Sequence, residues 1–536
     1  MHKETIIIGA GPAGIQLGCF LQQGGFDYLI IEKNDVPGSF FQKHPQTGKL
    51  ISINKKYTGY SNPEFNLRHD WNSLLSDNGP LFTSYSNDYY PKRDDLLRYL
   101  YDFTIVNNIV IQYGTNVTLI EKINNGYKLI VSYQDTLYVF TCTKLIVASG
   151  LVPRIPQDIV IRSDPLEKYP IPHYSHFPKD YFLQEENLAK YINKTLCIIG
   201  NGNSAMELAN HLVPYCSSII IYGKKPQRLS IQSNYTGDVR ALYLGFLDTF
   251  LLKSLNAIDY IPESDQYYIE KKDDKYMLIY NKDILAKKDI RFLSDHLSFD
   301  HMILATGWEF DSSMFSFPIE KKGRLPIITP EFESVSNQDL YFIGSLSHSL
   351  DHKVSSGGFI HGFRYSIKYL YQLKYVQHFD THKILCKDNW IKEVSDYVFF
   401  QLNQTSAIYQ MHGRFALIFF KENKTNSITI IRDVCIDLYH YTVHEHNPLS
   451  HVEKDDYVFI VTLEFNSNKN DRFSRIATKE SHSGTEYKAK LIHPIIKVYK
   501  NLKFVKELHC DEELLAKFIY PEWYNDRLEE FLRKFF

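Results

Sequence analysis

The stretch TIIIGAGPAG, residues 5–14, decides the fold of this chain. Its apolar run leads without a break into a glycine turn, which is typical of a strand buried on both faces of a parallel sheet. A helical stretch follows to Gln23, and the apolar segment YLIIE at residues 28–32 supplies the next strand. These segments together predict a β-α-β unit of the kind that binds dinucleotides.

The glycine turn has the spacing G-x-G-x-x-G. In this pattern Gly9 permits the tight turn, Gly11 lets the backbone approach a pyrophosphate, and Gly14 lets the helix pack on its strand. Glu32 ends the second strand 23 residues later (32 minus 9), where a carboxylate accepts both ribose hydroxyls. A merely glycine-rich turn would need neither the helix nor the acid. The residues expected to bind FAD here are Gly9, Gly11, Pro12, Ala13, Gly14, Glu32 and Lys33.

The same pattern returns in LCIIGNGNSA, residues 196–205, whose first glycine lies 191 residues after Gly9 (200 minus 9). The strand that follows does not end in an acid but runs into YGKKPQR, residues 222–228. Lysine and arginine attract a 2′-phosphate that a carboxylate would repel, so this unit is predicted to bind NADPH rather than NADH. The alternative is a solvated basic turn. The residues expected to bind NADPH are Gly200, Gly202, Asn203, Ser204, Ala205, Lys224, Lys225 and Arg228.

Three more apolar runs end in glycine, at Gly150, Gly307 and Gly344. Ligands of open parallel sheets lie beyond the carboxyl ends of the strands, so we expect these glycines to contact cofactor. The whole pattern predicts an α/β fold with two nested Rossmann-like dinucleotide-binding domains, FAD/NAD(P)-binding and three-layered, plus a C-terminal mixed α+β domain. The expected divisions are residues 1–160 and 295–380 for FAD, 161–294 for NADPH, and 381–536 for the accessory domain.

The bulk composition is that of an ordinary globular enzyme, with 44% hydrophobic and 23% charged residues among 536. The 60 Lys and Arg residues nearly balance the 62 Asp and Glu residues, so no overall field would gather nucleic acid. The apolar run at the N-terminus is too short for a signal peptide or a membrane span. The expectation is a cytoplasmic protein that acts on a small-molecule substrate.

The cysteines bear on where the electrons go after the flavin. The seven cysteines are dispersed and contain no C-x-x-C pair, which disfavours a reductase that relays electrons through a dithiol. Oxygen is a simpler acceptor, because a flavin hydroperoxide carries its own reactive oxygen and needs no protein nucleophile. His348, Asp351 and His352 could be taken for a metal cluster, but a solvated or substrate-facing loop is the favoured interpretation, and no metal is expected.

Several blocks of sequence resemble the flavin-containing monooxygenase superfamily, over about the first 375 residues. Within it they are similar to the ER flavoproteins associated with degradation, a group of FAD-dependent oxidoreductase-domain proteins. The block at residues 406–411 extends the likeness into the C-terminal region. The blocks are residues 49–55 (KLISINK), 64–75 (EFNLRHDWNSLL), 237–240 (GDVR), 307–311 (GWEFD), 355–365 (SSGGFIHGFRY) and 406–411 (SAIYQM).

The resemblance implies an NADPH-consuming monooxygenase that uses O2 and a flavin C4a-hydroperoxide to hydroxylate a small amine, amino acid or thioether. By the same resemblance Asn54 is the catalytic residue, close to flavin and nicotinamide. Two alternatives stay open: an NADPH oxidase or reductase that passes electrons to oxygen or a thiol partner, and a flavin-binding scaffold whose C-terminal domain recruits a protein partner. The further residues implied to bind FAD are Ser39, Phe40, Gly357, Gly358 and Phe359.

The chain departs from the superfamily pattern in three places. Residues 168–178, KYPIPHYSHFP, lack the glycine of the monooxygenase fingerprint. Ser345 follows Gly344 where the family has an acid. The final residues, 534–536, read KFF and are not an ER-retention tetrapeptide.

Overall fold

We describe the protein from a computed structural model of the whole chain. The described residues are 1–156, 160–162, 171–223, 227–243, 258–262, 267–272, 274–280, 296–422, 424–440, 449, 452–453, 456–465, 491–511, 513 and 515–536.

A seven-stranded sheet with a parallel core begins at the N-terminus, in the order β3-β2-β1-β6-β5-β4 with β19 beside β6. In β1, Ile8 pairs with Ile31 on one side and Val147 on the other, and Val147 also pairs with Phe342. The four central parallel strands therefore end at one edge, where the glycine turn begins. The strands are β1 (His2–Ile8), β2 (Tyr28–Ile31), β3 (Ile111–Gln112), β4 (Thr115–Ile123), β5 (Gly126–Tyr133), β6 (Thr136–Val147) and β19 (Leu340–Phe342).

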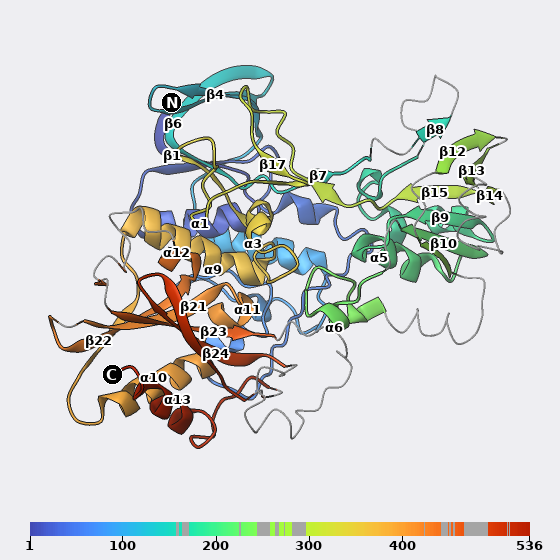
Figure 1. The fold of residues 1–536 in the computed structure, drawn as a ribbon. Coiled ribbons are helices and arrows are strands. Elements are labelled where there is room, and N and C mark those ends of the chain that lie inside the picture. The colour runs from blue at the N-terminus through green and yellow to red at the C-terminus, as the bar shows by residue number, and fades with distance from the viewer. Residues whose placement is uncertain are drawn as a thin grey trace.

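Helices α1 (Pro12–Gln23) and α9 (Ile360–Tyr371) pack against each other between this sheet and the C-terminal elements, as Figure 1 shows. α1 follows the first glycine turn directly, and nine of its twelve residues are buried. A third helix, α3 (Arg93–Val106), supplies Leu96, Leu100 and other apolar side chains to a neighbouring cluster. The helix that begins at the turn is thus held firmly at the sheet edge.

A second parallel sheet, with the order β11-β10-β9-β15, lies at the right of Figure 1. Helix α5 (Asn203–Leu212) follows β9 through the second glycine turn. Beside it stands a four-stranded sheet in the order β14-β13-β12-β8. The strands are β8 (Val160–Arg162), β9 (Thr195–Ile199), β10 (Ser218–Gly223), β11 (Ile258–Pro262), β12 (Tyr267–Lys272), β13 (Lys275–Tyr280), β14 (His296–Phe299) and β15 (His301–Leu304).

The parallel sheets confirm the predicted α/β class, but two strands lie on the other side of the predicted domain division. The division at residue 295 assigns β14 and β15 to the FAD-binding part, whereas β14 pairs with β13 and β15 pairs in parallel with β9 of the second unit. The cause is that an apolar run ending in glycine is the same signal for a strand of either sheet.

The C-terminal part is a six-stranded antiparallel sheet, β20-β22-β21-β23-β24-β25, with helices packed on it. It corresponds to the predicted mixed α+β part. Its strands are β20 (Thr381–Leu385), β21 (Phe415–Glu422), β22 (Ser427–Cys435), β23 (Tyr457–Glu464), β24 (His493–Lys500) and β25 (Lys503–His509). Its helices are α10 (Trp390–Gln404), α11 (Ala407–Gln410), α12 (Asp437–His440) and α13 (Asn525–Leu532).

One apolar core joins the first sheet to the C-terminal sheet. Tyr369 of α9 stands at the junction, with its ring 6.3 Å from Phe332, 5.8 Å from Phe379 and 5.9 Å from Phe415. The C-terminal part is therefore built onto the first unit by shared side-chain packing.

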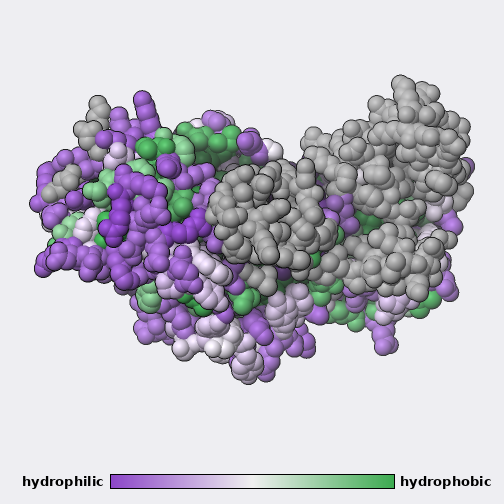
Figure 2. All heavy atoms as spheres, turned by 60° about the horizontal axis from the view of Figure 1, so that its bottom comes forward, coloured by the Kyte–Doolittle hydropathy of each residue, from purple (hydrophilic) through white to green (hydrophobic). Residues whose placement is uncertain are grey.

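Hydrophilic residues cover much of the described part of the face in Figure 2, with hydrophobic residues in separate patches. Among the described helices, none is long and apolar enough to cross a membrane.

Short elements complete the described chain. They are η1 (Ser39–Gln42), α2 (Pro63–Asn66), η2 (Phe82–Ser84), β7 (Val152–Pro153), η3 (Tyr174–His176), η4 (Tyr181–Leu183), α4 (Glu185–Leu188), η5 (Ala189–Tyr191), α6 (Ser230–Ser233), η6 (Ala241–Tyr243), β16 (Trp308–Glu309), β17 (Lys321–Lys322), β18 (Leu325–Pro326), η7 (Gly344–Leu350) and η8 (Gln372–Val376).

Candidate functional site

The first glycine turn has open space at one of its three glycines only. A Cβ on Gly9, whose φ is +103°, would lie 2.7 Å from the Ala148 carbonyl oxygen, and one on Gly14 would lie 2.0 Å from the Gly9 oxygen. A Cβ on Gly11 would meet no atom within 4 Å. No side chain caps the N-terminus of α1, so its first amides are free for an anion that approaches at Gly11.

Glu32 ties this turn to the segments around it. Its carboxylate is buried and accepts hydrogen bonds from the backbone N–H of Ala10 at 2.8 Å and of Asn34 at 3.0 Å. The Asn34 side chain at 2.9 Å and the Ser39 hydroxyl at 3.2 Å also donate to it. Three of these donors reach Oε1, whereas the Ala10 N–H alone reaches Oε2 among the described residues, so Oε2 keeps an acceptor site that suits a ribose hydroxyl.

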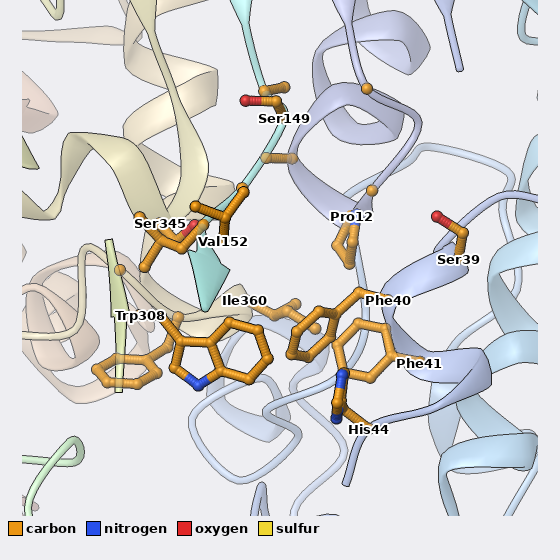
Figure 3. Close-up of a pocket in the computed structure, with 18 of the residues that line it drawn as sticks. Pro12, Ser39, Phe40, Phe41, His44, Ser149, Val152, Trp308, Ser345 and Ile360 are labelled. Atoms are coloured by element: carbon orange, nitrogen blue, oxygen red, sulfur yellow. The ribbon is translucent and has the colours of Figure 1, made fainter. Parts of the chain in front are cut away.

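A cavity of about 940 Å³ extends from the first glycine turn to the second unit. In Figure 3, Pro12, Ser39 and Ser149 lie toward one end of the view, and the rings of Phe40, Phe41, Trp308 and His44 gather at the other. The predicted site residues that line this cavity are Gly9, Gly11, Pro12, Ala13, Glu32, Lys33, Ser39, Phe40, Gly150, Asn203, Ser204, Gly358 and Phe359.

The aromatic end of the cavity carries no charge at neutral pH. The Phe40 ring is 46% exposed and lies 5.3 Å from Trp308 and 4.8 Å from His44. Burial lowers the pKa of His44 to about 3, with smaller contributions from the positive charges of Lys43 and Arg93. A neutral aromatic wall of this kind suits a planar, largely apolar ring.

The second glycine turn repeats the geometry of the first. A Cβ on Gly200, whose φ is +121°, would lie 2.1 Å from the Ala305 oxygen, whereas one on Gly202 would meet nothing within 4 Å. No side chain caps the N-terminus of α5. Asn203 and Ser204, at the start of α5, line the same cavity as the first turn. Residues of both turns therefore face one space.

Glu207 of α5 fixes the second unit against the first. Its carboxylate accepts from the Thr47 backbone N–H and hydroxyl, both at 2.9 Å, and from the Tyr174 hydroxyl at 2.7 Å. Burial raises the pKa of this carboxyl group. Glu207 and Tyr174 line the cavity but were not predicted as site residues, because no sequence spacing connects them to Thr47.

The other predicted residues that the structure describes lie outside the cavity lining. Asn54 is buried, and its amide nitrogen donates to the carbonyls of Ser86 at 2.9 Å and Asp88 at 3.2 Å. The Arg228 guanidinium lies 3.3 Å from the Asp238 carboxylate. Lys224 and Lys225 are outside the described residues. The remaining predicted residues beyond the lining are Gly14, Gly200, Gly202, Ala205, Gly307, Gly344 and Gly357.

A buried hydrogen-bonded chain supports the loop that carries Gly357 and Gly358. The Tyr235 hydroxyl lies 2.5 Å from His348 Nε2, and His348 Nδ1 lies 2.9 Å from Asp351. Asp351 also accepts from the Gly357 backbone N–H at 2.7 Å. Both ring nitrogens of His348 thus have protein partners, and within the described residues no group of three or more metal-ligating side chains is found.

All seven cysteines are free, and none of them lines the cavity. Cys19 lies on α1, near the first turn, but burial raises the pKa of its thiol to about 11. A thiol with so high a pKa stays protonated at neutral pH, and a protonated thiol is a poor nucleophile.

Comparison with known proteins identifies the family. Residues 6–344 match the family described as pyridine nucleotide-disulphide oxidoreductase. The chain is 35% identical over 454 residues to the mouse (Mus musculus) FAD-dependent oxidoreductase domain-containing protein 2, an alignment that covers 79% of this chain and 65% of the mouse protein. The chain thus spans less than two thirds of that relative.

Solved structures share the fold at low sequence identity. The bacillithiol disulfide reductase Bdr (YpdA) from Staphylococcus aureus matches with a TM-score of 0.51 and 16% identity, over 70% of this chain and 99% of the other. A flavin-containing monooxygenase from Stenotrophomonas maltophilia matches with a TM-score of 0.51 and 14% identity, over 70% and 99%. From the family match, the chain belongs to the pyridine nucleotide-disulphide oxidoreductases, and binding of FAD and NADP(H) follows from that membership.

Proposed function

We propose that the protein is an NADPH-consuming flavoprotein monooxygenase that acts on a small nucleophilic substrate such as an amine, an amino acid or a thioether. The observation that carries the proposal is the single cavity lined by residues of both glycine turns. Bound FAD would supply hydride acceptance and the reaction with oxygen. The protein's own residues bind the two cofactors, orient them and exclude water.

The first turn fits FAD. Gly11 leaves room for the pyrophosphate at the uncapped start of α1, where free amides and the helix dipole favour negative charge. Glu32 is placed for the ribose, since its Oε2 accepts only the Ala10 N–H among the described residues and can take a hydroxyl donor as well. Phe40 and the neutral rings around it suit the isoalloxazine ring.

The second turn fits NADPH in the same way. The open space at Gly202 and the free amides of α5 suit the pyrophosphate. Arg228 would have to share its charge between the 2′-phosphate and Asp238. The roles predicted for Lys224 and Lys225, and the catalytic role of Asn54, remain predictions, as do the domain divisions and the cytoplasmic location.

The composition of the cavity wall favours oxygen over a disulfide as electron acceptor. Reduction of a disulfide through the flavin calls for a reactive cysteine near the cofactor. No cysteine lines the cavity, and the thiol of Cys19 on α1 is held protonated. A second candidate is an NADPH oxidase that hydroxylates no substrate, because a cavity wall without cysteine suits electron transfer to oxygen in either reaction.

The decisive variants are Gly11→Val and Gly202→Val. Both positions have extended backbone angles and open space, so each variant is expected to fold like the wild type. Gly11→Val should purify without FAD. Gly202→Val should keep FAD and raise the KM for NADPH at least about tenfold, from loss of charge-assisted hydrogen bonds to phosphate.

Each variant is the control for the other, with flavin absorbance and NADPH oxidation as the two measurements. Retention of both properties in both variants would overturn the cofactor assignment. With a panel of amines, amino acids and thioethers, hydroxylation is shown by NADPH consumption that exceeds hydrogen peroxide release. If the NADPH consumed equals the hydrogen peroxide released with every compound, the protein is instead an oxidase.

A further inference from the structure

We propose that Arg240, held by a stack of rings, binds an anionic group of the substrate, so that the substrate is a small molecule that carries a carboxylate or a similar anion. The inference rests on the proposed function and narrows its substrate class. It places the recognition of the substrate at Arg240, whose backbone N–H donates to Asn203 of the second glycine turn.

Four planar groups form a continuous stack along the cavity wall. The rings of Phe359 and His361 lie 5.9 Å apart at 10°, and those of His361 and Trp71 lie 4.2 Å apart at 24°. The Arg240 guanidinium carbon lies 4.8 Å from the Trp71 ring centroid. All four residues line the cavity. The stack therefore holds the guanidinium at the cavity surface.

Within the described part of the chain, the Arg240 guanidinium has no counterion. Among the described residues, none forms an ion pair or a hydrogen bond with it, and its nearest electrostatic neighbours are the hydroxyls of Tyr90, Tyr89 and Tyr243. The residue is half-buried, and this burial lowers the pKa of the group. A partly desolvated cation without a counterion is stabilised when an anion joins it.

The carboxylates of the cavity wall already have partners. Glu32 accepts from Ala10, Asn34 and Ser39, and Glu207 accepts from Thr47 and Tyr174. Asp311 accepts from the Ser313 backbone N–H at 2.8 Å. These are the acidic residues of the lining, and none of them pairs with Arg240. The missing partner is thus expected from a ligand.

The backbone at Arg240 is fixed independently of the side chain. Its N–H donates to Asn203 Oδ1 at 3.0 Å, and the Asn203 amide nitrogen donates to the carbonyls of Gly237 at 3.2 Å and Asp238 at 3.1 Å. On the other side, the Trp71 indole N–H donates to the Arg68 carbonyl at 3.1 Å. With its backbone tied to Asn203 and its guanidinium over the Trp71 ring, Arg240 is preorganised for a two-pronged contact with a planar anion.

The neighbouring histidine adds no second charge. Burial and the positive charges of Arg364 and Arg240 hold the pKa of His361 well below its usual range. The site therefore offers one positive charge beside an apolar stack, which matches a ligand with one anionic group and an apolar remainder. A phosphate of NADPH shares the anionic chemistry, and the experiment must separate the two sources.

The test uses FAD-loaded protein, with benzoate as the anionic probe and benzamide as its neutral counterpart of the same shape. Isothermal titration should show that benzoate binds at least about tenfold more tightly than benzamide. In Arg240→Gln the affinity for benzoate should fall about tenfold, with benzamide unchanged. Arg240→Lys keeps the charge but loses the planar fork, so its affinity for benzoate should lie between those of the wild type and Arg240→Gln.

The matched control is Arg98→Gln, which removes a charge from an exposed position on α3 and should leave both affinities unchanged. Three results overturn the proposal: no binding of benzoate to the wild type, equal benzoate affinity in Arg240→Gln and the wild type, or a large rise in the KM for NADPH in Arg240→Gln with benzoate affinity intact. The last result would assign Arg240 to a cofactor phosphate. Because binding is measured without turnover, a protein that binds benzoate through Arg240 but hydroxylates nothing would refute only the proposed function.

Discussion

At the residue scale, Glu32 shows how one side chain serves the fold and the site together. Its carboxylate receives a hydrogen bond from the glycine turn at Ala10 and from Asn34 just beyond β2. It also reaches Ser39 at the start of η1, which carries Phe40. The turn, the strand end and the aromatic end of the cavity therefore depend on one buried group.

Glu32→Gln should reduce both stability and FAD retention. The amide nitrogen of glutamine would face protein N–H donors, so at least one buried hydrogen bond is lost, at a cost of about 1–3 kcal/mol in the free energy of unfolding. Urea denaturation and the flavin content of the purified protein measure the two effects. Glu121→Gln is the control, because Glu121 of β4 forms a half-exposed ion pair with Lys128 of β5, and it should change the free energy of unfolding by less than about 1 kcal/mol. Unchanged flavin content in Glu32→Gln would contradict the role given to this residue.

The sequence revealed those site residues whose type and spacing are dictated by backbone geometry. Gly9 and Gly200 are fixed by positive φ angles and close carbonyl oxygens, and Glu32 stands at a strand end that its motif predicts. Arg240 and Glu207 carry no such signal. Their roles arise from contacts with Trp71 and Thr47, which lie more than 150 residues away (240 minus 71, and 207 minus 47), and only the packing of two units brings them together.

At the scale of elements, the loop from η7 to α9 is held by Asp351. The carboxylate accepts from His348, from the Gly357 backbone N–H and from the Ser355 hydroxyl. Gly357 and Gly358 leave no room for a side chain, because a Cβ would lie 2.6 Å from Asp351 and 2.5 Å from His348 respectively. The loop thus folds tightly around this acid and presents Gly358 to the cavity.

Asp351→Asn should loosen this loop. The amide nitrogen would face at least one of the present donors, so about 1.5–3 kcal/mol of unfolding free energy is lost, as for a hydrogen bond to a charged group. These hydrogen bonds hold the pKa of Asp351 below its usual range, so its contribution is present above the unfolded pKa and lost as the pH falls through the lower folded value. The pH dependence of urea denaturation should therefore flatten in the variant at acid pH. Asp388→Asn, at an exposed position, should leave both stability and its pH dependence unchanged.

The central strands of the two sheets that carry the glycine turns were predicted well, and the strands of the other sheets poorly. A strand such as β1 or β9 is buried on both faces and shows as an unbroken apolar run. The sheet of β8, β12, β13 and β14 gives no such run, and β8 joins β12 across more than 100 residues (267 minus 160). Its partners could not be read from local sequence, and the same holds for the pairing order of the C-terminal sheet.

At the scale of the whole molecule, Arg68 joins the C-terminal part to the first unit. Its buried guanidinium donates to the carbonyls of Thr405 at 2.9 Å, Ala516 at 3.2 Å and Leu402 at 2.5 Å. Arg414, just before β21, donates in turn to the Leu350 carbonyl at 3.4 Å, in the loop that Asp351 holds. The C-terminal part is thus connected to the cavity from two directions.

Removal of the chain after Leu373 tests whether this part is a free module for a protein partner. The cut takes away 163 residues (536 minus 373), together with the C-terminal half of the core that Tyr369 of α9 contacts. We expect the shortened protein to aggregate or to bind hydrophobic dyes, and to lose FAD, because exposed core surface destabilises the fold by far more than a domain's usual margin of about 5–15 kcal/mol. Arg68→Met in the full chain is the milder variant and should lower the unfolding free energy by several kcal/mol, since three buried carbonyls lose their donor. A shortened protein that stayed monomeric, yellow and active would mean that the shared core is dispensable, and the C-terminal sheet would then be available as a recruiting surface.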